Sequence, residues 1–220
     1  IGGASLIMLP ARVAFEELGF HYTYNKSKKA IYVTGNTTTT NAPASTPIVN
    51  EPAVNTGLQA TAFKNMSTQE FINAVGPIAR EDYRKTGVLA SVTLAQAINE
   101  SGWGKSGLTQ NSNNMFGMKT SLSGNSWSGS VWDGRSYVEV KTREEYNGKK
   151  VTITAKFRKY PSVAQSIADH SAYLSNAMNG ARRRYNGLTD TKSYSSQLTI
   201  LQKGGYCTWS GYVSELTTLI

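Results

Sequence analysis

The stretch Ala90–Lys119, ASVTLAQAINESGWGKSGLTQNSNNMFGMK, contains the features that decide the fold of this chain. Apolar residues at helical spacing predict a helix that Ser91 caps and that stops at Gly102. A region rich in Gly, Ser, Asn and Trp follows, from residue 104 to 134. The pattern predicts a helix that ends abruptly and presents its last side chains at the start of a long polar segment.

The sharpest chemical clue lies at the end of this helix. Gln96, Glu100 and Trp103 are spaced i, i+4 and i+7, so they share a face that differs from the apolar core face. Lost hydration and the negative end of the helix dipole would both raise the pKa of the Glu100 carboxyl. A carboxylic acid that stays protonated near neutral pH can protonate a glycosidic oxygen. The local pattern alone favours a plainer interpretation, in which Glu100 is an exposed helix-end carboxylate paired with Lys105.

The surrounding sequence predicts an α+β domain over residues 67–220. Ser67-Thr68-Gln69-Glu70 forms a capping box, which predicts that a helix begins there. Alternating residues on both sides of Asn147-Gly148 predict a hairpin made of Tyr137–Tyr146 and Lys149–Tyr160. Helical spacing also recurs in three later segments, which begin near residues 161, 193 and 211. We therefore expect a mostly helical domain with a small β-hairpin lobe.

Two segments precede this domain. Residues 1–35 read as a short β-α-β-β segment: a strand at Ser5–Leu9, a helix after Pro10, and strands at His21–Tyr24 and Ala30–Thr34. Residues 36–66 read as a linker rich in Thr, Asn and Pro.

The sequence LPARVAFEELGFHYTYNKSKKAIYVTG, from Leu9 to Gly35, resembles about half of a copper amine oxidase N-terminal-like stalk repeat. The name of that family does not imply copper, and the segment has no plausible copper site. A piece of this size is too small for a core of its own, so we expect it to pack on the rest of the chain or to self-associate with a second copy.

Net charge and composition limit the classes of binding partner that this chain could have. The 220 residues include 23 Lys+Arg and 14 Asp+Glu, which gives a net charge of +9. A basic protein favours an anionic partner, which could be nucleic acid, a membrane surface or a bacterial wall polymer. Nucleic-acid binding has no matching motif here, and no apolar run approaches the roughly 18 residues of a membrane span. One Cys and two His exclude an intramolecular disulfide and a three-histidine metal site, so we expect no metal and no cofactor.

The blocks AQAINESGWGKS, NNMFGMK and KTREEYNGKKVTITAKFRKYPSVAQSIADH together resemble glycoside hydrolase family seventy-three, the bacterial endo-β-N-acetylglucosaminidases. The resemblance runs from about residue 67 to 220. It implies a lysozyme-like fold, a secreted protein of the cell wall or cell surface, and peptidoglycan glycan strands as substrate. The implied reaction is hydrolysis of the β-1,4 bond between N-acetylglucosamine and N-acetylmuramic acid.

The same resemblance implies roles for particular residues. Glu100 would be the general acid, Glu145 the second carboxylate, and Tyr185 a residue near the sugar. The chain departs from the family pattern at Ala90, where Pro is usual, and after Tyr206, where the family tends toward YATD. The second departure concerns the far end of the expected cleft.

The second carboxylate has an alternative. A two-residue turn pairs Glu145 with Lys150 and places Glu145 on the polar face of the hairpin, with Glu144 on the other face. A one-residue bulge would exchange the two residues. A carboxyl separation of about 5–5.5 Å would indicate retention and about 6.5–9.5 Å inversion, while the substrate's acetamido group offers a third route. We favour inversion or substrate assistance.

Several other residues are candidates for substrate contact, each with a structural alternative. Trp103 could stack on a sugar or plug the core, and Asn114 could touch ligand or shape the cleft floor. His170 lies on an apolar helix face and is expected to be buried. The run Arg182–Arg184 could bind an anionic wall polymer or could simply form a solvent-exposed surface, and the sequence favours neither. The expected substrate-binding residues are Gln96, Trp103, Asn114, Tyr160, Tyr185 and Tyr206.

Three other functions compete with the glucosaminidase interpretation. A lytic transglycosylase or muramidase with a single catalytic Glu would tolerate Glu145→Gln, because it needs no second carboxylate. A wall-binding module that kept the fold would not clear purified cell walls. A thiol amidase that pairs Cys207 with His170 is disfavoured, because Cys207 does not lie at a helix start.

Overall fold

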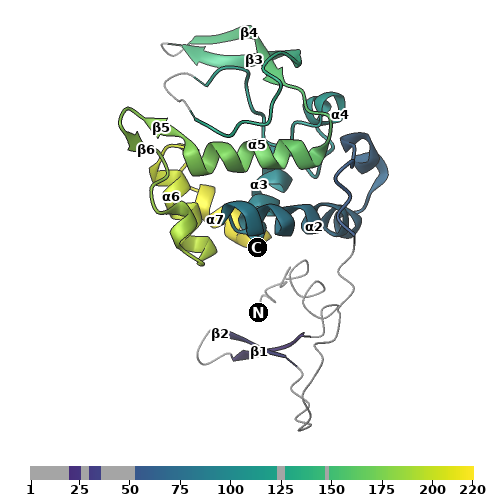
Figure 1. Ribbon diagram of the computed structural model, residues 1–220, viewed down its shortest axis with the longest axis vertical. Coiled ribbons are helices and arrows are strands. Elements are labelled where there is room, and N and C mark those ends of the chain that lie inside the picture. Colours follow the sequence, from purple (N-terminus) through teal and green to yellow (C-terminus); the bar gives the residue numbers. More distant parts are fainter. Residues whose placement is uncertain (1–19, 26–29, 36–52, 123–126, 147–148) are drawn as a thin grey trace, which may run out of the picture. The chain divides into compact units, whose positions relative to one another are not determined.

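This computed structural model describes residues 20–25, 30–35, 53–122, 127–146 and 149–220 (Figure 1). The chain divides into two units, residues 1–51 with 219–220, and residues 52–218. In the first unit, β1 (Phe20–Asn25) and β2 (Ala30–Gly35) pair antiparallel, with Tyr22 opposite Val33. This pairing confirms the two predicted strands of that segment, while the strand expected at Ser5–Leu9 and the helix expected after Pro10 lie outside the described residues.

The second unit is mostly helical and carries a small antiparallel hairpin. Its α-helices are α2 (Thr68–Thr86), α3 (Ala90–Ser101), α4 (Gly107–Ser112), α5 (Val163–Asn176), α6 (Tyr194–Lys203) and α7 (Tyr212–Leu219). The hairpin consists of strands β3 (Tyr137–Tyr146) and β4 (Lys149–Arg158). The unit also contains the 3-10 helices η1 (Ala60–Asn65) and η2 (Leu188–Asp190) and the short strands β5 (Met178–Asn179) and β6 (Arg182–Arg183). Helix α2 packs on α3 and α5, and in Figure 1 α5 runs between the hairpin and α2.

The start of α2 and the register of the hairpin agree with the predictions made from local sequence signals. The Ser67 hydroxyl accepts from the Glu70 backbone N–H, and the Glu70 carboxylate accepts from the Ser67 N–H, so the capping box that starts α2 is formed. In the hairpin, Tyr146 pairs with Lys149 and Glu145 with Lys150, and the register continues without a bulge to Tyr137 opposite Arg158. The hairpin register predicted from the sequence is therefore confirmed.

The start of α3 differs from the prediction. The helix begins at Ala90, its N-cap is Leu89, and no side chain caps it, so the prediction of Ser91 as the cap was wrong. The Leu89 N–H donates instead to the Gln197 side chain at 3.0 Å, and the Gln197 amide donates to the Gly87 carbonyl. A buried residue of α6 thus fixes the turn before α3, which no local pattern could reveal.

The packed domain includes residues upstream of Ser67, the residue at which the sequence placed its start. Leu58, Ala60 and Phe63 are buried, and the Phe63 ring lies 4.8 Å from the Phe71 ring between centroids. A Cβ added to Gly104 would overlap the Phe63 ring, so the second glycine of the SGWG sequence leaves the space that Phe63 fills. Helix α4 and η1, which the sequence did not predict, pack on each other.

A buried ion pair joins the hairpin to the helical body. The Arg158 guanidinium lies 2.7 Å from Asp169 Oδ2, and both side chains are almost fully buried. The same carboxylate accepts from the Tyr160 hydroxyl at 2.7 Å, from Ser130 Oγ at 2.6 Å and from the Val131 N–H at 3.1 Å. Asp169 therefore ties β4 and the loop after residue 126 to α5.

Candidate active site

Glu100 lies in the last turn of α3, where the backbone turns sharply. Gly102 and Trp103 both have positive φ angles, 57° and 61°, so the helix stops before Trp103. The half-buried Trp103 ring packs edge-on against Phe71 at 5.6 Å between centroids. The face expected to hold Gln96, Glu100 and Trp103 together is thus interrupted, and Trp103 belongs to the contact between α2 and the α3 end.

Gln96 also lies in the interior. Its side chain is fully buried, and its Nε2 donates to the Tyr212 hydroxyl at 2.9 Å. The helical turn from Gln96 to Glu100 passes from the interior to the surface, where Glu100 is exposed. The structure therefore gives Gln96 the role of a link between α3 and α7.

Glu100 opens into a groove of about 410 Å³. Segments far apart in the sequence build its walls. The lining residues are Glu100, Phe116, Gly117, Met118, Leu122, Tyr173, Arg184, Gly205, Tyr206 and Cys207. The groove presents one carboxyl group amid aromatic and apolar side chains, with a guanidinium from Arg184, which is a composition suited to a polar ligand with apolar faces.

The surroundings of Glu100 favour its protonated form. Loss of hydration raises the pKa of the Glu100 carboxyl, and a hydrogen bond from the Asn99 side chain opposes this rise only in part. The side chain is accessible to solvent, but it sits in a hollow where protein atoms replace much of its water. The predicted direction of the pKa shift is confirmed, and its cause is desolvation in the groove.

Tyr206 lines the same groove as Glu100 and is influenced by the charge of its carboxyl group. Burial raises the pKa of the Tyr206 hydroxyl well above its usual range, and the negative charge of ionised Glu100 raises it further. The Tyr206 hydroxyl lies 3.0 Å from His170 Nε2. Tyr206 therefore stays protonated and can offer a hydroxyl group on the wall of the Glu100 groove.

His170 is buried, as the sequence predicted. Its ring stacks on Phe116 at 3.8 Å between centroids, and burial lowers its pKa to about 3. Its Nδ1 has no hydrogen-bond partner among the described residues. A neutral His170 thus supports two groove residues, Phe116 by stacking and Tyr206 through its hydroxyl.

Besides Gln96, three further predicted substrate-binding residues are internal in this structure. Asn114 is fully buried, and its amide donates to the Met118 and Arg158 carbonyls at 2.9 Å each, which holds the groove loop against the hairpin base. Tyr160 is buried and donates to Asp169. Tyr185 is buried, with its hydroxyl 3.2 Å from that of Tyr173, so it supports the groove from behind.

Sequence reasoning missed most of the groove lining. Arg184 donates to the Gly204 and Gly205 carbonyls at 2.7 and 2.8 Å and to the Tyr173 hydroxyl at 3.1 Å, and in this way it holds the loop that carries Tyr206. In the sequence, only the run Arg182–Arg184 pointed to a possible role for Arg184. Cys207 is half-buried in the same wall, within the stretch where the sequence departs from the family pattern.

For Glu145, the second expected carboxylate, the structure gives only the position of the backbone. The uninterrupted pairing of β3 and β4 puts position 145 opposite Lys150 and position 144 opposite Val151. The side chains of Glu144 and Glu145 lie outside the part of the molecule that the structure describes. Within the described residues, no group of three His, Cys, Asp or Glu side chains could hold a metal ion.

Comparison with known proteins identifies the family. The sequence profile described as glucosaminidase, mannosyl-glycoprotein endo-beta-N-acetylglucosaminidase, matches residues 76–220. Among curated relatives, the exo-glucosaminidase LytG of Bacillus subtilis is 34% identical over 152 residues, 69% of this chain and 50% of LytG. The peptidoglycan hydrolase FlgJ of Pseudomonas aeruginosa is 35% identical over 157 residues, 70% of this chain and 36% of FlgJ. The chain thus spans half or less of the length of these relatives.

Solved structures agree with this result. The catalytic domain of the autolysin Auto from Listeria monocytogenes matches with a TM-score of 0.59 and 34% identity, over 71% of this chain and 85% of that domain. A truncated glycoside hydrolase domain of FlgJ from Salmonella typhimurium matches with a TM-score of 0.53 and 31% identity, over 70% of this chain and 95% of that one. The chain belongs to the glucosaminidase family of glycoside hydrolases.

Proposed function

We propose that this chain hydrolyses peptidoglycan at the β-1,4 bond between N-acetylglucosamine and N-acetylmuramic acid, with Glu100 as the general acid. The observation that carries the proposal is a carboxyl group of raised pKa on the wall of a groove of about 410 Å³. Relatives named peptidoglycan hydrolase and autolysin support the same substrate.

The geometry suits proton donation to a leaving oxygen. A protonated Glu100 can pass its hydrogen to the bridging oxygen while the bond to the anomeric carbon breaks. Tyr206, which lines the same groove, stays protonated, so its hydroxyl can donate a hydrogen bond to the sugar when His170 Nε2 is the donor in their shared bond. Tyr173 and Phe116 add apolar lining to the groove.

The products of digestion test this function directly. We expect purified peptidoglycan treated with the chain to yield fragments whose new reducing ends are N-acetylglucosamine, because that is the residue whose anomeric carbon is attacked. Borohydride reduction followed by mass spectrometry identifies the end group. New reducing ends on N-acetylmuramic acid would assign a muramidase, 1,6-anhydro ends a lytic transglycosylase, and no new ends a wall-binding module.

We propose Glu145 as the second carboxylate. The choice follows the family resemblance of the hairpin, and the bulge-free register, which keeps position 145 opposite Lys150 and position 144 opposite Val151, does not exchange the two residues. Glu145→Gln is expected to lower kcat by about 100-fold or more, the usual contribution of a general base, while its neighbour variant Glu144→Gln stays within a few-fold of wild type. Wall-clearing rates of the two purified variants make the comparison. Equal activity of Glu145→Gln and wild type would remove this assignment.

The site of action belongs to the same proposal. A peptidoglycan hydrolase acts at the cell wall or cell surface, so we infer secretion, and the net charge of +9 would favour contact with anionic wall polymers. No helix in the described part of the chain combines the length and the apolar character that crossing a bilayer requires.

A further inference from the structure

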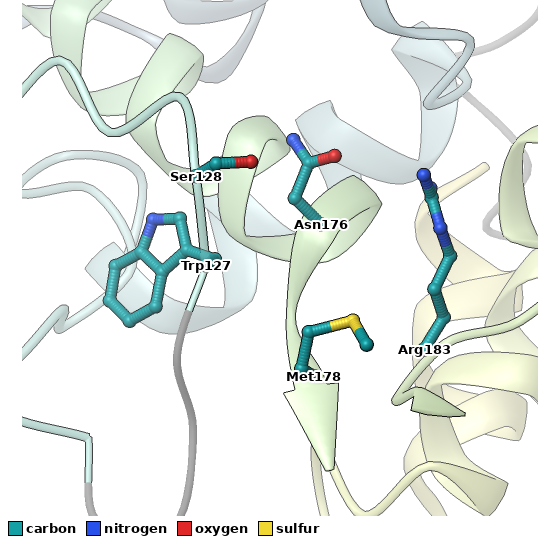
Figure 2. A pocket seen from close by; sticks show the side chains of 5 residues that line it. All are labelled: Trp127, Ser128, Asn176, Met178 and Arg183. Carbon is teal, nitrogen blue, oxygen red and sulfur yellow. The ribbon is translucent and has the colours of Figure 1, made fainter. Parts of the chain in front are cut away.

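A second cavity lies beside the Glu100 groove and shares no lining residue with it. Its volume is about 380 Å³. The lining residues, shown in Figure 2, are Trp127, Ser128, Asn176, Met178 and Arg183. Two of them come from the loop after residue 126, and the other three come from the end of α5 and the β5–β6 strands. Neither the sequence nor the proposed reaction has assigned this cavity a role.

The walls of this cavity are held in place. The Arg158 guanidinium lies over the Trp127 ring at 4.5 Å, and Tyr173 packs edge-on against that ring at 5.1 Å. The loop is fastened to α5 by the hydrogen bonds from Ser130 and Val131 to Asp169. A preformed cavity loses little conformational freedom when a ligand binds, so its binding energy is not spent on ordering the protein.

The polar groups of the cavity favour an anionic, amide-containing ligand. Arg183 Nη1 donates to the Ser175 carbonyl at 2.7 Å, which fixes the guanidinium and uses one of its five N–H donors. Figure 2 shows the Ser128 hydroxyl pointing toward Asn176, while the ends of Asn176 and Arg183 extend in the same direction. A guanidinium recognises a carboxylate, and an amide beside a hydroxyl can pair with a peptide group. Trp127 and Met178 add apolar surface for a small aliphatic side chain.

Tyr173 connects this cavity to the Glu100 groove. The Tyr173 side chain lines the groove, and its ring contacts Trp127, which lines the second cavity. Two adjacent residues also connect the two sites: Arg183 lines the cavity and Arg184 lines the groove. A branched polymer could therefore place its backbone in one hollow and a side branch in the other.

We propose that the cavity lined by Trp127, Asn176 and Arg183 binds the carboxylate-bearing peptide branch of the glycan substrate. This inference rests on the proposed function and deepens it, because peptidoglycan carries a short acidic peptide on each N-acetylmuramic acid. Arg183 pairs with a peptide carboxylate, and Asn176 and Ser128 bind the peptide backbone. The cavity thus selects glycan that still carries its peptides.

Measurements of ligand binding by a variant that hydrolyses the substrate only slowly test the proposal. In the Glu100→Gln background, calorimetry measures the Kd of two probes, an N-acetylglucosamine–N-acetylmuramic acid disaccharide with its tetrapeptide and the same disaccharide without it. We expect the tetrapeptide to tighten binding about tenfold or more, the contribution of a charge-assisted hydrogen bond. Adding Arg183→Gln is expected to remove this gain, and adding Arg182→Gln, the same change one residue earlier on the exposed strand β6, to keep it.

Four results would overturn the proposal. The first is that the tetrapeptide probe does not bind, and the second is that the tetrapeptide does not increase the affinity of the disaccharide. The third is that the increase in affinity survives Arg183→Gln, and the fourth is that Arg182→Gln removes it as fully as Arg183→Gln does. A phosphate-polymer site is the competing possibility, and soluble poly(glycerol phosphate) that binds through Arg183 while the tetrapeptide gives no gain would establish it instead. Hydrolysis of glycan stripped of peptides by the wild-type chain reports on the proposed function separately, because that substrate cannot occupy the second cavity.

Discussion

Glu100→Gln is expected to reduce kcat on peptidoglycan by about 100- to 10,000-fold, the contribution of a general acid. Gln fills nearly the same volume and can still donate a hydrogen bond, but it cannot give a proton to the leaving oxygen. Since the side chain is exposed in its groove and no ion pair of the described residues involves it, the fold should be unchanged. Clearing of purified walls measures activity, and thermal unfolding measures the fold.

The matched control for this variant is Glu81→Gln. Glu81 lies on the exposed side of α2 and pairs with Arg84 and Lys85, away from the groove lining. Its substitution removes one carboxylate without touching the site, so wall clearing should equal that of the wild-type chain. Wild-type clearing by Glu100→Gln, with both variants folded, would end the assignment of Glu100 as the acid.

Asp169→Asn is expected to lower the free energy of unfolding by about 3–5 kcal/mol, the usual cost of leaving a buried charge without its partner. The variant would leave the Arg158 guanidinium buried at the base of the hairpin, and it would weaken the bonds from Tyr160 and from the loop after residue 126. Urea unfolding followed by tryptophan fluorescence gives the free energy.

The exposed ion pairs of Glu81 again supply the comparison. Glu81→Gln should lower the free energy of unfolding far less than Asp169→Asn does, because water screens exposed pairs. A double variant, Asp169→Leu with Arg158→Met, should recover part of the loss, since no buried charge remains. If Asp169→Asn costs no more than Glu81→Gln, the ion pair does not anchor the hairpin.

Elements governed by local signals could be predicted from the sequence. The capping box of Ser67 and Glu70 needs only residues within one turn, and it forms as expected. The hairpin register follows from a two-residue turn and alternating strands, and it too is confirmed. The burial of His170 followed from its place on an apolar helix face.

Features that depend on distant partners could not be predicted. Spacing shows that Gln96 and Glu100 share a helix side, but the partner of Gln96 is Tyr212, and this contact draws Gln96 into the core. Likewise Gln197 replaces a local cap before α3, and the positive φ of Trp103 ends the helix before that ring reaches the predicted face. In each case tertiary contacts override the local pattern.

The candidate site shows the same division. The position of Glu100 at the helix end and the rise of its pKa followed from the sequence, because both depend on one helix and its surroundings. The rest of the groove comes from residues 116–122 and 205–207 together with Tyr173 and Arg184, which only the folded chain brings together. The motif residues therefore included two that line the groove, Glu100 and Tyr206, but few of the residues around them.

The contact between Phe63 and Gly104 has a consequence for how such domains are joined to other modules. Leu58 accepts a backbone bond from Val163, Ala60 donates to Asn113, and Phe63 fills the space that Gly104 leaves. Residues 58–66 belong to the stretch expected to be a linker, yet within it the Phe63 side chain packs beside the turn that follows Glu100. A fusion junction at residue 57 or earlier keeps this whole segment, whereas one after Phe63 would leave the space beside Gly104 unfilled.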